Sequence, residues 1–234
     1  MPYLPVNGGH GAITTVGRMR NGIQIWMDDL NSVTIAQDGK TAQIGGGALS
    51  KTVIDAFLLG PGLGGGHGFL QGRYGLISDN FVSVNIVMAD GNLHTIDECS
   101  DLWWAIQGAG HNFGIVTSVT SKIYDIEHRT WSYTAFTFTG DKIEQIYQAA
   151  NDHLNGTQPM DVTNYSFFIN LPSIDPNGII QICQRGPVTV TRTHRAKKSD
   201  LLILASLSTS NYTILKPNDK YTTFSNPPPK RRQH

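Results

Sequence analysis

Glycine-rich turns that contain histidines are the segments of this chain whose residue types could do chemistry. The densest run is Gly62–Gly68, which contains His67, and an earlier run, Gly8–Gly11, contains His10. Glycine is unfavourable inside helices and strands, because it loses much backbone entropy on folding and has no side chain to pack. It suits turns whose backbone N–H groups approach a phosphate closely. The Gly62–Gly68 run therefore predicts contact with the phosphates of a nucleotide cofactor. His10, taken alone in the earlier run, suits a turn residue as well as a chemical one.

Two common phosphate-binding motifs do not fit this chain. Gly45–Thr52 resembles a P-loop, but Ser50 replaces the required second glycine and the preceding strand belongs to a hairpin. No later acidic strand end offers a magnesium ligand, so we favour a strand, a turn and a helix capped by Ser50. A Rossmann motif at Gly60–Gly68 should follow a strand and open a helix, whereas a helix precedes this run and a Tyr-Gly loop follows it.

The histidines and cysteines do not predict a metal site. His67 and His111 stand beside glycines and could be metal ligands in principle, but they lack the i, i+4 spacing and the carboxylate companions that are typical of a zinc site. Cys99 and Cys183 lack metal-ligand spacing, and the sequence leaves open whether they form a disulfide.

Composition narrows the class of protein. The chain has 234 residues, 25 glycines, 39% hydrophobic residues and a formal net charge of zero. A neutral chain has no general attraction to nucleic acid or to an anionic membrane. No segment is apolar enough to span a bilayer, and the N-terminus lacks the pattern of a signal peptide, so we leave the localisation unassigned. The basic cluster at 230–232 is expected to be a solvated tail.

The first half of the chain has the pattern of short strands separated by two helices. Asp38-Gly39 is a strong hairpin signal, and the run from Phe81 to Met88 alternates, which places its even-numbered positions on one face. Ser50 is the candidate cap of the first helix; Ser100 or Asp101 is that of the second, which should stop at Gly108. The expected strands are Gly22–Trp26, Val33–Ala36, Thr41–Ile44, Phe81–Met88, Leu93–Thr95 and Ile115–Tyr124.

The second half predicts a further, mixed unit. Its elements are a strand at Thr130–Thr139, a helix at Asp141–Leu154, and strands at Asn164–Leu171 and Ile179–Cys183. This order indicates an α+β fold class with an incomplete second domain. We divide the chain at 1–128, 129–185 and 186–234, the last part being an irregular, poorly ordered tail.

Taken together, these segments resemble the berberine-bridge-enzyme-like FAD-linked oxidoreductases, whose FAD domain is of the vanillyl-alcohol-oxidase (PCMH) type, and most closely their fungal branch. The resemblance covers roughly residues 5–185. The segments that carry it, in their order along the chain, are Gly8–His10, Gly62–Gly68, Gly72–Leu76, Asp79-Asn80, Asp90-Gly91, Asp101–Gly108 and Asn112–Val116.

The resemblance implies a flavoprotein that oxidises a small molecule, such as an intermediate of secondary metabolism, by hydride transfer to the flavin with dioxygen as acceptor. It assigns His10 to covalent flavin attachment, but it names no catalytic base. Tyr74 and His67, although near the cofactor loop, are more readily explained as structural. The residues assigned to FAD contact are Gly8, Gly9, His10, Gly11, Gly62, Gly64, Gly65, Gly66, His67, Gly68, Asn80, Asn112, Gly114, Ile115 and Val116.

The chain also departs from the family pattern. It begins just before His10, has no second flavin-linking cysteine between Phe57 and Gly62, and nothing after residue 185 matches the family's C-terminal half. The alternative expectation is therefore a truncated homologue that is catalytically inactive or that acts as a binding or assembly fragment without FAD.

Overall fold

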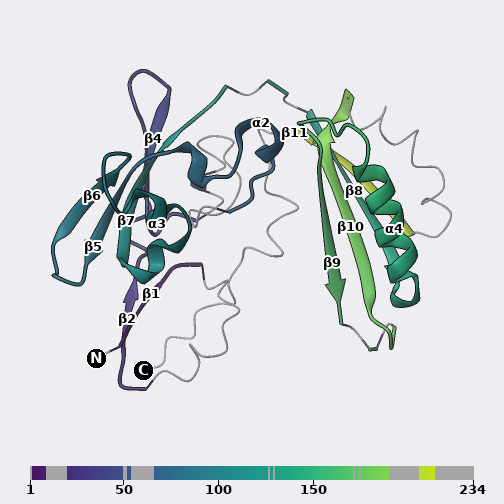
Figure 1. Cartoon of the computed structure of the whole chain (residues 1–234), viewed down its shortest axis with the longest axis horizontal. Coiled ribbons are helices and arrows are strands. Elements are labelled where there is room, and N and C mark those ends of the chain that lie inside the picture. The colour runs from purple at the N-terminus through teal and green to yellow at the C-terminus, as the bar shows by residue number, and fades with distance from the viewer. Residues whose placement is uncertain are drawn as a thin grey trace. The chain divides into compact units, whose positions relative to one another are not determined.

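The computed structural model describes residues 2–8, 20–49, 52–53, 66–125, 127–128, 130–170, 172–173, 175–189 and 206–213. They form two compact units, each with a sheet of its own (Figure 1). Over the described residues, the first unit consists of those up to Gly68 and of Tyr74–Asp125. The second consists of Phe69–Arg73 and of the residues after Ile126.

The first unit is built on a five-stranded sheet in the order β3-β4-β7-β5-β6, in which all paired strands are antiparallel. A separate parallel pair, β1 and β2, precedes it in the chain. Two short helices, α3 and η3, lead from β6 into β7. The bounds are β1 Tyr3–Val6, β2 Ile23–Trp26, β3 Val33–Ile35, β4 Thr41–Gly45, η2 Ser78–Asn80, β5 Phe81–Met88, β6 Leu93–Asp97, α3 Trp103–Ala109, η3 Gly110–Asn112 and β7 Gly114–Lys122.

The hairpin predicted at Asp38-Gly39 is confirmed. Strands β3 and β4 pair on either side of it, and Gly39 has the positive φ of 66° that this turn requires. The Asp38 carboxylate accepts a hydrogen bond of 2.9 Å from the backbone N–H of Lys40, which closes the turn.

The bounds predicted for β5 are confirmed, but the face assigned to it is only partly right. Val84 and Ile86 are buried as expected, whereas Val82 is exposed and Phe81 is buried in its place. The cause is a bulge: the pairing with β7 passes from Phe81 directly to Ser83, so that the extra residue reverses the alternation at this end of the strand. Val84, Ile86 and the facing Val119 form the centre of the first unit's core.

The start and the stop expected for α3 are also corrected. No side-chain cap is present, because the Ser100 hydroxyl bonds instead with the Asp97 carboxylate and backbone N–H, both at 3.1 Å. Gly108 lies within the helix, and the chain continues into η3. The helix predicted after Ser50 falls largely outside the described residues; of its residues, Thr52 and Val53 are described, both are helical, and Val53 is buried.

The run Gly45–Gly47 is a crossing where backbones pack against one another. A Cβ on Gly45, Gly46 or Gly47 would lie within 2.0 Å, 2.1 Å or 1.7 Å of the carbonyl oxygens of Leu30, Val116 and Met27. The backbone N–H groups of residues 45–48 donate to Ser32, Thr117, Leu30 and Gly45. These donors are occupied by protein carbonyls and could not cradle a phosphate as a P-loop does.

The second unit is an antiparallel sheet in the order β11-β8-β10-β9, with α4 packed along one face (Figure 1). Ile146 of α4 packs against Phe136, Phe138 and Ile180 of the sheet. The bounds are β8 Thr130–Thr139, η4 Gly140–Lys142, α4 Ile143–Leu154, β9 Thr163–Ile169, β10 Ile179–Pro187 and β11 Ser206–Thr213.

Strand β11 was not expected, because its residues were assigned to an irregular tail. It pairs with β8 along its whole length, from Ser206 opposite Thr137 to Thr213 opposite Thr130. A strand rich in Ser and Thr has no hydrophobic alternation that would indicate it. Strand β10 likewise continues past the expected end at Cys183 to Pro187.

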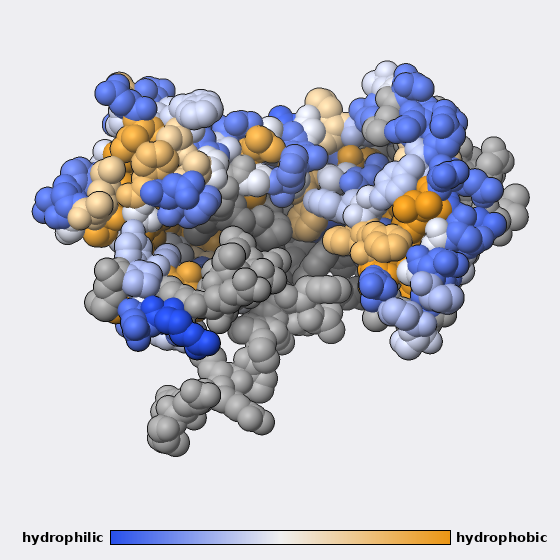
Figure 2. Space-filling model, turned by 60° about the horizontal axis from the view of Figure 1, so that its bottom comes forward, coloured by the Kyte–Doolittle hydropathy of each residue, from blue (hydrophilic) through white to orange (hydrophobic). Residues whose placement is uncertain are grey.

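Two further findings concern the cysteines and the surface. Cys99 is exposed and Cys183 is buried, both are free, and burial raises the pKa of the Cys183 thiol. Hydrophobic residues interrupt a largely hydrophilic surface in the space-filling view (Figure 2). No helix within the described ranges combines the length and apolar character that crossing a bilayer requires.

A pair of glycine substitutions tests whether the crossing is structural. Gly47→Ala places its Cβ against the Met27 carbonyl and is expected to lower the free energy of unfolding by about 3 kcal/mol. Gly108→Ala, in a helix with open space around the new methyl group, is expected to raise it by about 0.5–1 kcal/mol. Urea unfolding of the two variants measures both; equal effects would contradict this explanation of the glycine run.

Candidate functional site

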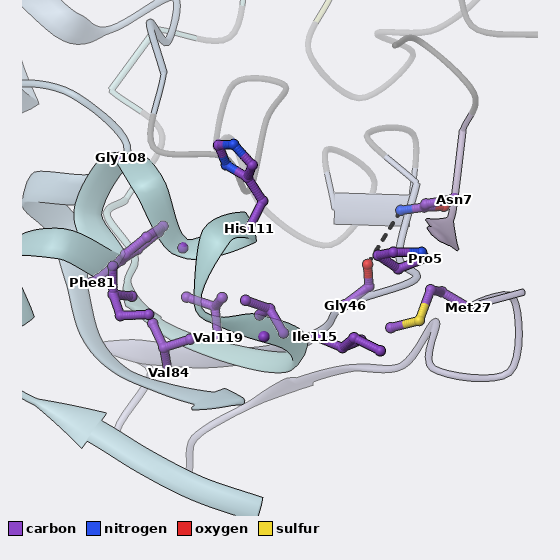
Figure 3. A pocket seen from close by; sticks show the side chains of 14 residues that line it. Pro5, Asn7, Met27, Gly46, Phe81, Val84, Gly108, His111, Ile115 and Val119 are labelled. Atoms are coloured by element: carbon purple, nitrogen blue, oxygen red, sulfur yellow. Dashed lines mark hydrogen bonds between the residues drawn. The ribbon is translucent and has the colours of Figure 1, made fainter. Parts of the chain in front are cut away.

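A cavity of about 270 Å³ lies within the first unit (Figure 3). Its polar side chains are those of Asn7 and His111, and among the described residues that line it there is no carboxylate, lysine or arginine. Four glycines bring backbone close to the space: Gly46, Gly108, Gly110 and Gly114. The remaining walls are apolar and consist of Pro5, Met27, Phe81, Val84, Ile106, Ile115, Val116 and Val119.

Asn7 presents a buried hydrogen-bond acceptor that has no partner among the residues that the structure describes. Its Nδ2 donates to the carbonyl of Gly46 (Figure 3) and to that of Ala48, both at 3.3 Å. Its Oδ1 is buried and has no hydrogen-bond partner among the described residues. Rotating the amide by 180° would not help, since it would face Oδ1 with two carbonyl oxygens. A buried acceptor without a donor is unfavourable, so Asn7 suits a ligand that donates an N–H or O–H group.

His111 lines another side of the cavity, at the short helix η3 between α3 and β7 (Figure 3). His111 is exposed, so the cavity is open to solvent beside this residue. Within the described ranges no group of three or more histidine, cysteine or acidic residues could hold a metal ion.

Three of the residues predicted to contact a cofactor line this cavity together. They are Gly114, Ile115 and Val116, at the beginning of β7. Gly8 directly follows Asn7 in the chain, and Asn112 lies in η3 with its residue exposed. Six predicted contact residues lie outside the described part of the chain: Gly9, His10, Gly11, Gly62, Gly64 and Gly65.

The end of the glycine run, Gly66–Gly68, is fixed by a neighbouring turn. The carbonyl oxygen of Gly66 accepts a hydrogen bond of 3.0 Å from the backbone N–H of Ile77, and Gly68 is buried close to the Ile77 side chain. His67, between them, is exposed. These three residues do not line the cavity.

Asn80 is buried and is engaged within the protein. Its Nδ2 donates to the carbonyls of Tyr74 and Leu76, at 3.0 Å and 2.8 Å, and its Oδ1 accepts a bond of 2.7 Å from the hydroxyl of Tyr124. The rings of Tyr74 and Tyr124 stack with their centroids 3.9 Å apart. The side chain of Asn80 therefore holds the turn that leads into β5, and it does not line the cavity.

Comparison with known proteins identifies the family. No family model matches the chain. It is 53% identical over 211 residues to the FAD-linked oxidoreductase chyH of Penicillium rubens, and 47% identical over 226 residues to the FAD-linked oxidoreductase chry5 of Gibberella zeae. The chain belongs to the fungal FAD-linked oxidoreductases. These matches take in 81% and 88% of the chain but 42% and 45% of the relatives, so the chain spans less than half of their length.

Solved structures show that this FAD-linked oxidoreductase chain has the fold of the berberine-bridge-enzyme-like flavoproteins. It superimposes on Physcomitrella patens BBE-like 1 with a TM-score of 0.70, covering 91% of this chain and 50% of that one, at 20% identity. The TM-score with a chitooligosaccharide oxidase is also 0.70, covering 92% and 49%, at 21% identity. The mixed helix and sheet class expected from the sequence is thereby confirmed.

Asn7 is not among the site residues predicted from the sequence of this FAD-linked oxidoreductase. No strand is predicted before the Gly-Gly-His turn, whereas Tyr3–Val6 forms β1 and ends directly before Asn7. The available signal was position, since Asn7 immediately precedes Gly8. Its two carbonyl partners lie about forty positions later and could not be deduced from the sequence.

A substitution of Asn80 distinguishes a structural role from a cofactor contact. Asn80→Asp replaces two donors by a carboxylate that faces two carbonyl oxygens, and we expect it to lower the free energy of unfolding by about 3 kcal/mol without any flavin present. The control Tyr124→Phe removes one hydrogen bond to the same amide and should lower it by about 1 kcal/mol. Unchanged stability of the flavin-free Asn80→Asp protein would contradict the structural role.

Proposed function

We propose that the chain binds FAD through its first unit and is the flavin-binding part of an oxidoreductase that acts on a small molecule. The observation that carries the proposal is a cavity that is lined both by Asn7, directly before the Gly8–Gly11 run, and by Gly114–Val116. The homology to FAD-linked oxidoreductases supports it.

The residues of the cavity fit the adenosine end of FAD. A volume of 270 Å³ is slightly below the range of about 300–1,000 Å³ that is usual for complete small-molecule sites, so the space suits part of a dinucleotide. The apolar walls suit a flat base, and Oδ1 of Asn7 can accept a hydrogen bond from an amino or hydroxyl group of adenosine. A neutral lining requires that backbone N–H groups bind the pyrophosphate, a role that we assign to Gly8–Gly11.

When bound, FAD supplies the redox chemistry, taking up a hydride from the substrate and passing the electrons to dioxygen. The chain's own residues bind and orient it. We assign covalent attachment to His10, on the strength of the family resemblance and of its place three positions after Asn7. Asn80 and Ile77 act indirectly, by holding the turn against which Gly66–Gly68 lies.

We further propose that the second unit contributes substrate contacts, and that the substrate is an intermediate of secondary metabolism. In the β8–β10–β9 register, the face of the sheet opposite α4 carries Tyr133, Tyr165 and Gln181. Aromatic rings and amides of this kind suit a polar ring compound. Strand β10 aligns them by pairing with both of its neighbours.

Ligand binding to the apoprotein tests the cavity. We expect FAD and ADP to compete for one site and FMN, which lacks the adenosine end, not to displace ADP. Asn7→Leu should weaken ADP binding about tenfold, whereas Asn31→Leu, at an exposed asparagine, should leave it unchanged. Isothermal titration measures the affinities, and thermal unfolding verifies that both variants are folded. ADP binding that Asn7→Leu does not change would contradict the assignment of the cavity.

The visible spectrum tests the attachment to His10. The purified chain should be yellow, and its flavin should remain with the protein after acid precipitation. In His10→Ala the flavin should be released by acid. A colourless chain that takes up no added FAD would contradict the proposal and would favour the alternative of a fragment that acts without FAD.

A further inference from the structure

Residues Gly66–Ile77 form a loop, called the lobe below, that begins with the glycine run Gly66–Gly68 and leaves the first unit for the second before it returns. Phe69–Arg73 belong to the second unit, whereas the residues on both sides, up to Gly68 and from Tyr74, belong to the first. At its base the lobe is closed by the hydrogen bond of 3.0 Å from the Ile77 N–H to the Gly66 carbonyl. The glycine run is therefore held at one end by the first unit and continues directly into a segment held by the second.

Arg73 makes the principal polar contact at the tip of the lobe. Its Nε and Nη2 donate to Oδ1 and Oδ2 of Asp161, both at 2.8 Å, which is the bidentate geometry of a strong arginine–carboxylate pair. Asp161 lies between α4 and β9, 88 positions later in the chain, and its side chain is 14% exposed. The partial burial limits screening of the pair by salt.

The same guanidinium also reaches the second connection between the units. Its Nη1 pairs with the carboxylate of Glu127. Glu127 lies two positions after Asp125, which is the last residue of the first unit in this part of the chain. The neighbouring His128 has its Nε2 at 3.8 Å from Oδ2 of Asp161. The hydrogen bonds to Asp161, above all, raise the pKa of Arg73, so the guanidinium stays charged. The Arg73 guanidinium thus ties its own segment, Phe69–Arg73, to Glu127 in the other segment that connects the units.

The rest of the tip is packed closely on the same unit. The Thr163 hydroxyl donates to the Phe69 carbonyl at 2.7 Å, and the guanidinium of Arg185 lies 3.7 Å from the centre of the Phe69 ring. Gly72 lies so close to the Met160 carbonyl that a Cβ would be 2.4 Å from its oxygen. These contacts hold the tip, Phe69–Arg73, against the rest of the second unit, and the ion pair of Arg73 holds its C-terminal end.

We propose that Arg73 is a positioning residue that, through its ion pair with Asp161, restrains the lobe Gly66–Ile77 and thereby limits opening of the glycine run. The consequence for FAD rests on the proposed function and on the contact between this run and the cofactor that the family resemblance implies. The restraint itself belongs to the protein and can be measured without flavin.

Hydrogen–deuterium exchange on the full flavin-free chain tests the restraint. Arg73→Gln removes the charge, and we expect the amides of 66–77 to exchange about threefold to tenfold faster, while those of β5 stay unchanged. The charge-reversed pair Arg73→Asp with Asp161→Arg should recover most of the protection. Lys142→Gln is the matched control, because this lysine of the same unit pairs with the adjacent Asp141, at 3.0 Å.

The outcomes separate this inference from the proposed function. If Arg73→Gln fails to fold, Arg73→Lys keeps the charge but loses the bidentate geometry, and it should show the faster exchange. Exchange of 66–77 that is unchanged in the folded variants, or equally changed throughout both units, would overturn the inference even if FAD binds normally. Where FAD binds, its release from the His10→Ala background should also be threefold to tenfold faster with Arg73→Gln. A chain that binds no FAD at all would refute the proposed function and leave the exchange result to decide the restraint.

Discussion

The first unit depends on the close approach of three backbone segments at Gly45–Ala48. The bulged residue Thr117 of β7 accepts the Gly46 N–H at 2.8 Å, and the loop after β2 accepts that of Gly47 through Leu30 at 2.9 Å. Asn7, after β1, donates to two carbonyls of the same run. Because a Cβ would collide with a carbonyl oxygen at three successive positions, this junction requires glycine. It joins the β1–β2 pair to the large sheet and forms one wall of the cavity.

Glycine therefore has two separate uses in this chain. At Gly45–Gly47 it permits protein backbones to approach one another, and the N–H groups there are occupied. At Gly114 it permits the start of β7 to pass within reach of the Val87 carbonyl on one side while the strand lines the cavity on the other. The glycine content by itself would not separate a wall of the site from a ligand contact. The hydrogen bonds of the backbone N–H groups distinguish the two uses, because a donor that is already occupied cannot bind a phosphate.

Local patterns made much of the secondary structure predictable. The turn at Gly39, the bounds of β5 and β8, and the helix α4 follow from residue types that act within a few positions. What could not be predicted depends on distant partners. The bulge that buries Phe81 in place of Val82 exists only in the pairing with β7, and β11 is defined by backbone pairing with β8. The hydrogen bonds of the Asn80 and Asn7 side chains likewise depend on partners far along the chain. The family resemblance pointed to Gly114–Val116, but it could not show that Asn7 lines the same cavity.

A crystal structure of the chain grown with FAD would show whether the cavity holds the adenosine. We expect electron density for the adenosine end within the cavity, against Gly114–Val116, with a donor of the ligand within hydrogen-bond distance of Asn7 Oδ1. An FAD molecule whose adenosine lies elsewhere on the first unit, with the cavity and Asn7 Oδ1 unchanged, would contradict it.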